Sequence, residues 1–176
     1  MKLYFTGFEP FAGLDYNPSW EAAHGAAEAV DATAELLEVT FEAAQVIPPN
    51  DVDIVVHFGL ARRREDVCLE RYAHNWWATL EEPRALHRID PDGEVALECA
   101  LPLAEIADEL DGTLELTWRV SHDAGPFVCN ATLYHSLARF GLKRALFVHI
   151  PDVPPADARE LGQALAECLT RQLHTP

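Results

Sequence analysis

Residues 113–150 read TLELTWRVSHDAGPFVCNATLYHSLARFGLKRALFVHI, and their pattern indicates the fold class. Alternating apolar residues at 113–120 predict a half-buried strand. A Gly/Pro turn follows, and residues 130–140 then predict a helix that ends at Gly141. The apolar run 145–150 predicts a strand buried on both faces. Strand, helix and strand in this order are typical of a sheet covered by helices.

The rest of the chain repeats this alternation. Asn17-Pro18 predicts the start of a helix that reaches about Val30, because Asn caps helices and Pro favours their first position. An irregular region at 75–93 is long enough to be functional or mobile. We expect one domain over residues 1–176, a three-layer α/β/α sandwich. The remaining predicted strands are 2–6, 36–41 and 52–58, and the remaining predicted helices lie around 103–110 and 161–173.

The charge balance and the short apolar runs disfavour nucleic-acid and membrane partners. Asp and Glu number 29 against 13 Lys and Arg, a formal net charge of −16, which disfavours nucleic acid. The basic run Arg62-Arg63-Arg64 is followed at once by Glu65-Asp66, so we interpret it as a solvated loop or helix end. The first residues do not form a signal peptide, and no apolar stretch approaches the roughly 18 residues of a membrane span. We expect a cytoplasmic protein without nucleic-acid or membrane partners.

One of the four cysteines has a distinctive setting. Cys129 follows Gly125-Pro126 and comes just before the predicted helix, where unpaired N–H groups favour a thiolate and can stabilise an oxyanion. The spacing of Cys68, Cys99 and Cys168 forms no CxxC pair, so we expect neither disulfides nor a zinc site. The histidines show no ligand spacing and the glycines no phosphate-binding motif, so we expect no metal and no cofactor.

A thiolate nucleophile needs a base and a group that orients the base. His149 ends the predicted strand 145–150, and Glu70 follows another strand and turn. Ligand sites of open α/β sheets lie at the carboxyl ends of strands, so Cys129, His149 and Glu70 are candidates for a triad. The residues alone leave other interpretations open: a buried structural cysteine, a hydrogen-bonded structural histidine, and a surface ion pair between Glu70 and Arg71 or Arg64.

Four blocks in chain order carry a family resemblance: TGFEPFAG at 6–13 with NPSW at 17–20, LERYAHN at 69–75, AGPFVCN at 124–130 and FVHIP at 147–151. Together they closely resemble the motifs of the type I pyroglutamyl peptidases, also called pyrrolidone-carboxylate peptidases. The resemblance implies a cysteine exopeptidase that removes an N-terminal pyroglutamyl residue from peptides through a thioester acyl-enzyme. It also implies a mixed, mostly parallel sheet, as in phosphorylase-like hydrolases, and a homo-oligomer, commonly a tetramer.

The same resemblance implies roles for individual residues. Cys129 would be the nucleophile, His149 the general base and Glu70 the acid that orients it. Phe8 and Phe11 would sandwich the pyroglutamyl ring, although by themselves they fit plain core packing. Phe127 and Val128 would bring backbone groups to the lactam, a small neutral ring that suits apolar walls with a few hydrogen bonds.

Two positions depart from the family pattern. Many bacterial relatives carry a polar residue, often Gln, where this chain has Leu60, and an arginine where it has Leu80. We expect Leu60 to line the substrate site. Arg84 and Arg88, further along the loop, are candidates to replace the missing arginine, and Arg84, four residues past Leu80, is the first choice. The segment 41–52 is also short for the family. These departures leave two alternatives: a diverged amidohydrolase for another cyclic acyl group, and a non-catalytic protein that binds pyroglutamyl peptides.

Overall fold

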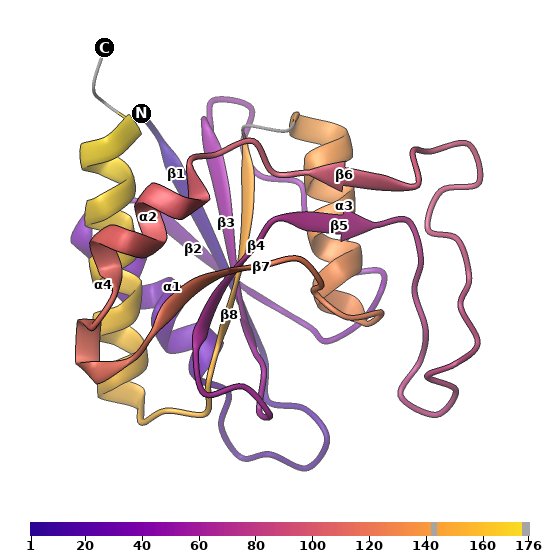
Figure 1. The fold of residues 1–176 in the computed structure, drawn as a ribbon, viewed down its shortest axis with the longest axis horizontal. Coiled ribbons are helices and arrows are strands. Elements are labelled where there is room, and N and C mark those ends of the chain that lie inside the picture. The colour runs from indigo at the N-terminus through magenta and orange to yellow at the C-terminus, as the bar shows by residue number, and fades with distance from the viewer. Residues whose placement is uncertain (142–143, 174–176) are drawn as a thin grey trace.

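The fold is built on a six-stranded sheet, in a computed structural model that describes residues 1–141 and 144–173 (Figure 1). Its strands are β1 (Leu3–Phe8), β2 (Thr33–Leu37), β3 (Ile54–Leu60), β4 (Val67–Glu70), β7 (Trp118–Ser121) and β8 (Ala145–Ile150). They run in the order β2-β1-β3-β8-β4-β7 across the sheet. All neighbours pair in parallel except β4 and β8, which are antiparallel. The expected mixed, mostly parallel sheet is therefore confirmed.

Helices cover both faces of this sheet. α1 (Pro18–Ala29), α2 (Leu103–Leu110) and α4 (Pro155–Leu173) lie on one side, and α3 (Val128–Phe140) lies on the other (Figure 1). A short antiparallel pair, β5 (Tyr72–His74) with β6 (Ala96–Glu98), packs beside α3. This arrangement confirms the three-layer α/β/α sandwich. Across the described residues, no helix is long and apolar enough to span a bilayer.

The first helix starts and packs as its sequence predicts. Asn17 caps α1, since its Oδ1 accepts a hydrogen bond of 3.1 Å from the Ser19 N–H, and Pro18 opens the first turn. Small buried residues of α1 then allow α4 to approach closely. A Cβ atom at Gly162 of α4 would lie 1.9 Å from the carbonyl oxygen of Ala22, so only glycine fits there.

Several predicted elements have different limits in the structure, and α4, for example, begins at Pro155 rather than near residue 161. The strand predicted at 36–41 is instead β2, at the edge of the sheet, where only Leu37 is buried and the apolar pattern is weak. The strand predicted at 113–120 begins as a 3₁₀ turn, η1 (Thr113–Glu115), with a positive φ of 56° at Leu114, and only β7 is extended. α3 begins at Val128, so Cys129 lies within its first turn rather than before it.

A wholly buried histidine ties the sheet to α3. His57 of β3 makes two hydrogen bonds of 2.8 Å, one with Thr6 Oγ1 of β1 and one with Ser136 Oγ of α3. Burial lowers the pKa of His57 to about 3. The side chain is therefore neutral at physiological pH, and it anchors α3, whose first turn holds Cys129.

Candidate active site

A cavity of about 570 Å³ opens where β3 and β8 end and α3 begins. Cys129 and His149 both face it, as do Gly59 and Leu60 of β3. Parallel β3 and β8 place Gly59 opposite His149 in register, which brings the end of each strand to the same place. The structure thus brings the candidate nucleophile and the candidate base to one cavity.

Glu70 contacts His149 from the neighbouring strand. Its Oε1 lies 2.7 Å from His149 Nδ1, and both side chains are buried. β4 runs antiparallel to β8 with Cys68 opposite His149, so Glu70 reaches the imidazole diagonally. Glu70 is the last residue of β4 and so lies at a strand end as expected, but β4 and β8 run in opposite directions. A carboxylate on Nδ1 requires the proton there and leaves Nε2 for another partner.

The imidazole of His149 is held in its charged form. Burial lowers its pKa, but the Cys129 sulfur, through its charge and a hydrogen bond, and the Glu70 carboxylate raise it to about 9. Burial likewise raises the pKa of Glu70, but the hydrogen bond with His149 and the nearby Arg64 bring it below its ordinary value. At neutral pH the site therefore holds an imidazolium and a carboxylate beside the sulfur.

The Cys129 sulfur lies at the start of α3, where the first-turn N–H groups have no partner within the helix. Gly59 leaves room for it: a Cβ atom there would lie 3.3 Å from Cys129 Sγ and 2.6 Å from the Phe147 ring. The sulfur, the imidazolium and a helix N-terminus form a nucleophile with oxyanion donors close by. No pattern in the sequence predicted that Gly59 packs against Cys129, because this contact joins residues of three different elements.

The apolar residues predicted around the ring line the cavity. Phe8 is buried and Phe11 is half-buried, and Leu60, Phe127 and Val128 also line the cavity. Leu80 also lines the cavity although it is 60% exposed, so an apolar group stands at the position where the family resemblance implies an arginine.

The structure does not bring Arg84 to the cavity. Its side chain is exposed, and the cavity lining from this loop consists of residues 78–81. Hydrogen bonds from Glu82 N to Thr79 Oγ1 and from Ala85 N to Glu82 O form successive turns after Leu80. These turns carry the chain past the cavity mouth, which is why the expected replacement for the missing arginine is not at the site.

A different arginine does reach the triad candidates. Arg62 and Arg63 are exposed, as expected for a solvated run, but Arg64 is only 23% exposed and lies 2.6 Å from Glu70 Oε1. The interpretation of the whole run as solvated is therefore wrong for its third member. Glu70 contacts both His149 and Arg64, whereas Arg71 pairs with Glu98.

Metal-site geometry is absent from residues 1–141 and 144–173, where no cluster of His, Cys, Asp and Glu could hold an ion. The groups available are the Cys129 sulfur, an imidazolium and a carboxylate, at a cavity lined by apolar residues together with Arg62, Arg63 and Arg64. Such a set suits acyl transfer from a substrate with a small apolar or neutral acyl group.

Comparisons with known proteins agree with this chemistry. The family model described as pyroglutamyl peptidase matches residues 1–172. The chain is 33% identical to a pyrrolidone-carboxylate peptidase of Gloeobacter violaceus, over 97% of this chain and 91% of that protein. It is 34% identical to pyrrolidone-carboxylate peptidase 1 of Ralstonia nicotianae, over 90% of this chain and 81% of that protein.

Solved structures show the same likeness. Pyroglutamyl peptidase I of Bacillus amyloliquefaciens superposes with a TM-score of 0.79 at 28% identity, over 95% of this chain and 94% of that one. Pyrrolidone carboxyl peptidase of Thermus thermophilus gives a TM-score of 0.77 at 28% identity, over 93% of this chain and 98% of that one. The likeness therefore spans the whole architecture, including the strands that carry the cavity.

Proposed function

Because the chain belongs to the pyroglutamyl peptidase family of cysteine peptidases, we propose that Cys129, His149 and Glu70 carry out its catalysis. The enzyme removes the N-terminal pyroglutamyl residue from peptides. The observation that carries the assignment of residues is the 2.7 Å contact between Glu70 Oε1 and His149 Nδ1, beside a sulfur at a helix N-terminus. This is the order of nucleophile, base and orienting acid that acyl transfer requires.

The proposed reaction proceeds through a thioester. The Cys129 thiolate attacks the carbonyl carbon of the pyroglutamyl residue, and the N–H of Cys129 stabilises the oxyanion. His149 then donates its proton to the leaving amine as the C–N bond breaks. Water, deprotonated by His149, hydrolyses the thioester and releases pyroglutamate and the thiol. Throughout, Glu70 holds the proton on Nδ1 and stabilises the imidazolium.

The proposed substrate contacts are apolar. Phe8 and Phe11 pack against the lactam ring, and Leu60 with Phe127 and Val128 encloses it. Support comes from their common place on the wall of one cavity. With Leu60 and Leu80 apolar, the hydrogen bonds to the lactam come from backbone groups. Arg84 has no part in this contact set, since its side chain is exposed outside the cavity.

The proposal extends to the assembly and location of the protein. Residues 1–176 form one domain, supported by a single continuous core around the six-stranded sheet. We further propose that the protein forms a homo-oligomer, a tetramer as the family resemblance implies, and that it is located in the cytoplasm. Light scattering coupled to size-exclusion chromatography measures the assembly, and a monomeric mass would contradict that part.

The test is hydrolysis of a fluorogenic pyroglutamyl amide. Cys129→Ala removes the nucleophile, so turnover falls to background, whereas Cys168→Ala, at a buried cysteine of α4, keeps the parental rate. Activity on other cyclic acyl amides but not on the pyroglutamyl amide would instead favour a diverged amidohydrolase. Binding of a pyroglutamyl peptide by the parent without any turnover would favour a non-catalytic binding protein.

A further inference from the structure

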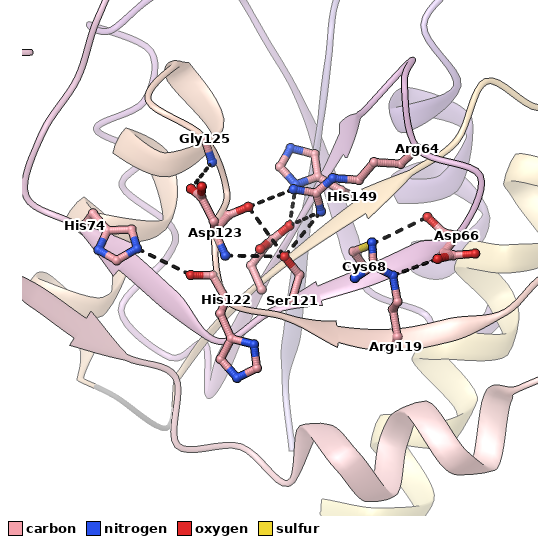
Figure 2. Close-up of polar contacts among 11 residues, drawn as sticks. Arg64, Asp66, Cys68, His74, Arg119, Ser121, His122, Asp123, Gly125 and His149 are labelled. Atoms are coloured by element: carbon pink, nitrogen blue, oxygen red, sulfur yellow. Dashed lines mark hydrogen bonds and ion pairs between the residues drawn. The ribbon is translucent and has the colours of Figure 1, made fainter. Parts of the chain in front are cut away.

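Arg64 occupies a position that joins the triad to the loop before the nucleophile. It lies in the turn between β3 and β4, where its N–H donates to the Ala61 carbonyl at 2.9 Å. From there its side chain reaches inward, while the two arginines before it stay exposed. Figure 2 shows its polar contacts converging on the end of the Arg64 side chain.

One oxygen of Glu70 is shared between Arg64 and His149. Arg64 Nη1 donates to Oε1 at 2.6 Å, and His149 Nδ1 lies 2.7 Å from the same atom. Within the described part of the chain, no donor reaches the buried Oε2. The carboxylate of Glu70 is wholly buried, so it keeps its charge through these two charged donors, with a further contribution from the Ser121 hydroxyl. A buried carboxylate that loses one of two charged partners is strongly destabilised as an anion.

The other end of the guanidinium holds the loop that leads to Cys129. Nη2 donates to the Asp123 carbonyl at 2.7 Å, and Nη1 makes a longer contact of 3.4 Å with Ser121 Oγ. Asp123 Oδ1 in turn accepts from the Gly125 N–H at 2.8 Å (Figure 2). Gly125 has a φ of 77°, a left-handed conformation in which the turn reverses toward α3. Arg64 therefore connects the orienting acid with the segment that positions the nucleophile.

We propose that Arg64 is a positioning residue of this enzyme: it keeps Glu70 turned toward His149 and ties the Ser121–Gly125 loop to it. The inference rests on the roles proposed above for Cys129, His149 and Glu70. The role assigned to Arg64 is exerted through Glu70 and this loop, although Arg64 also lines the cavity. The planar, permanently charged guanidinium suits this role, because its two terminal nitrogens donate hydrogen bonds to Glu70 and to the Asp123 carbonyl at the same time.

The charge of Arg64 also acts on the protons of the site. A cation beside Glu70 favours the carboxylate and disfavours the imidazolium, so its removal raises the apparent pKa values that limit activity on both sides. Arg119 provides a matched control, because it pairs with Asp66 at 2.7 Å and is half exposed. The other titratable groups that face Arg64 and Glu70 are Cys68 on β4, His149 on β8 and Cys129 beyond it.

The experiment compares Arg64→Gln, Arg64→Lys and Arg119→Gln for kcat, KM and the pH profile of kcat/KM with a pyroglutamyl amide. Loss of a charged hydrogen bond predicts a fall in kcat of about tenfold to hundredfold in Arg64→Gln, with KM changed less than kcat. Both limbs of its pH profile move up by about one unit. Arg64→Lys keeps the charge, so its limbs stay at the parental pH and part of kcat returns. Arg119→Gln behaves as the parent.

A double variant separates this inference from the proposed triad. If Arg64 acts through Glu70, Arg64→Gln adds little further loss of kcat to Glu70→Gln, because both changes remove the same function. Full additivity, or parental kcat in Arg64→Gln, would overturn the inference. If Arg64→Lys lost as much kcat as Arg64→Gln and the limbs of Arg64→Gln also stayed at the parental pH, the inference would be overturned as well, since Arg64 would then not act through the charge of Glu70. Parental kcat in Glu70→Gln alone would instead refute the triad itself.

Discussion

Gly59→Ala is the substitution that the packing beneath the nucleophile makes most informative. A Cβ atom at this position would lie 2.6 Å and 2.8 Å from two atoms of the Phe147 ring and 3.3 Å from Cys129 Sγ. Phe147 is fully buried and its ring centroid is 4.8 Å from that of His149, so the ring has no free space to retreat into. The added methyl group therefore pushes on the sulfur directly and on the imidazole through Phe147.

The expected cost has two parts. Overpacking of a filled core costs about 1–3 kcal/mol of unfolding free energy. For a chain of this size that lowers Tm by about 2–12 °C, at roughly 2–4 °C per kcal/mol. Displacement of reacting groups by a fraction of an ångström to about 1 Å costs up to about a hundredfold in rate. We therefore expect kcat to fall by about tenfold to hundredfold.

The assay measures Tm by calorimetry and kcat with the fluorogenic pyroglutamyl amide. Gly112→Ala is the matched control: Gly112 has a φ of 85°, and nothing lies within 4 Å of an added Cβ atom. It loses about 1–2 kcal/mol through backbone strain but keeps the parental kcat. If Gly59→Ala lowers Tm and leaves kcat unchanged, the ring relaxes away from His149 and the reasoning fails. Parental Tm and parental kcat in Gly59→Ala would mean that a Cβ atom at position 59 does not meet Phe147 and Cys129 closely.

Three further predictions concern titratable groups. Glu70→Gln removes the charge that orients His149, so kcat falls by about tenfold to hundredfold with little change in KM, and a rise in KM at constant kcat would make Glu70 a substrate ligand. Because the pKa of His149 is raised to about 9, the imidazolium that protonates the leaving amine persists until that pH, and kcat/KM declines only above it; a decline near pH 6.5 would contradict this. The pKa of His57 is lowered to about 3, so below its ordinary value of 6.5 the unfolded chain gains a proton that the folded one does not. Unfolding free energy then falls by up to about 1.4 kcal/mol per pH unit, a loss seen in urea titrations that His57→Gln should lack.

Much of the fold follows from local patterns in the chain. The strand 145–150 and the helix capped at Asn17 agree closely with β8 and α1, because long apolar runs and cap residues are strong local signals. The position of β2 was predicted wrongly, because an exposed edge strand has little apolar pattern by which to recognise it. The antiparallel direction of β4 depends on how the chain crosses the sheet, which no local pattern encodes.

The site residues that belong to a motif could be predicted from the sequence. Side-chain contacts between residues far apart in the chain could not. Cys129 lies in the first turn of α3 and His149 is next to the last residue of β8, so their meeting at one cavity could be expected. Arg64 looks like its two exposed neighbours in the sequence, and only the turn after β3 directs it inward. The prediction that Arg84 lies at the cavity was wrong for the opposite reason. Arg84 is close to Leu80 in the chain, but two turns between them separate it from the cavity.

The most direct test of the central claim, that Cys129 is the nucleophile activated by His149, is the site of alkylation. The parent enzyme is treated with limiting iodoacetamide at neutral pH, and labelled peptides and residual activity are followed together by mass spectrometry and the amide assay. Cys129 is half-buried at the cavity, whereas Cys68, Cys99 and Cys168 are buried. The account predicts one label, at Cys129, that appears at the rate at which activity is lost. Inactivation with the label on another cysteine, or full activity with Cys129 labelled, would contradict it.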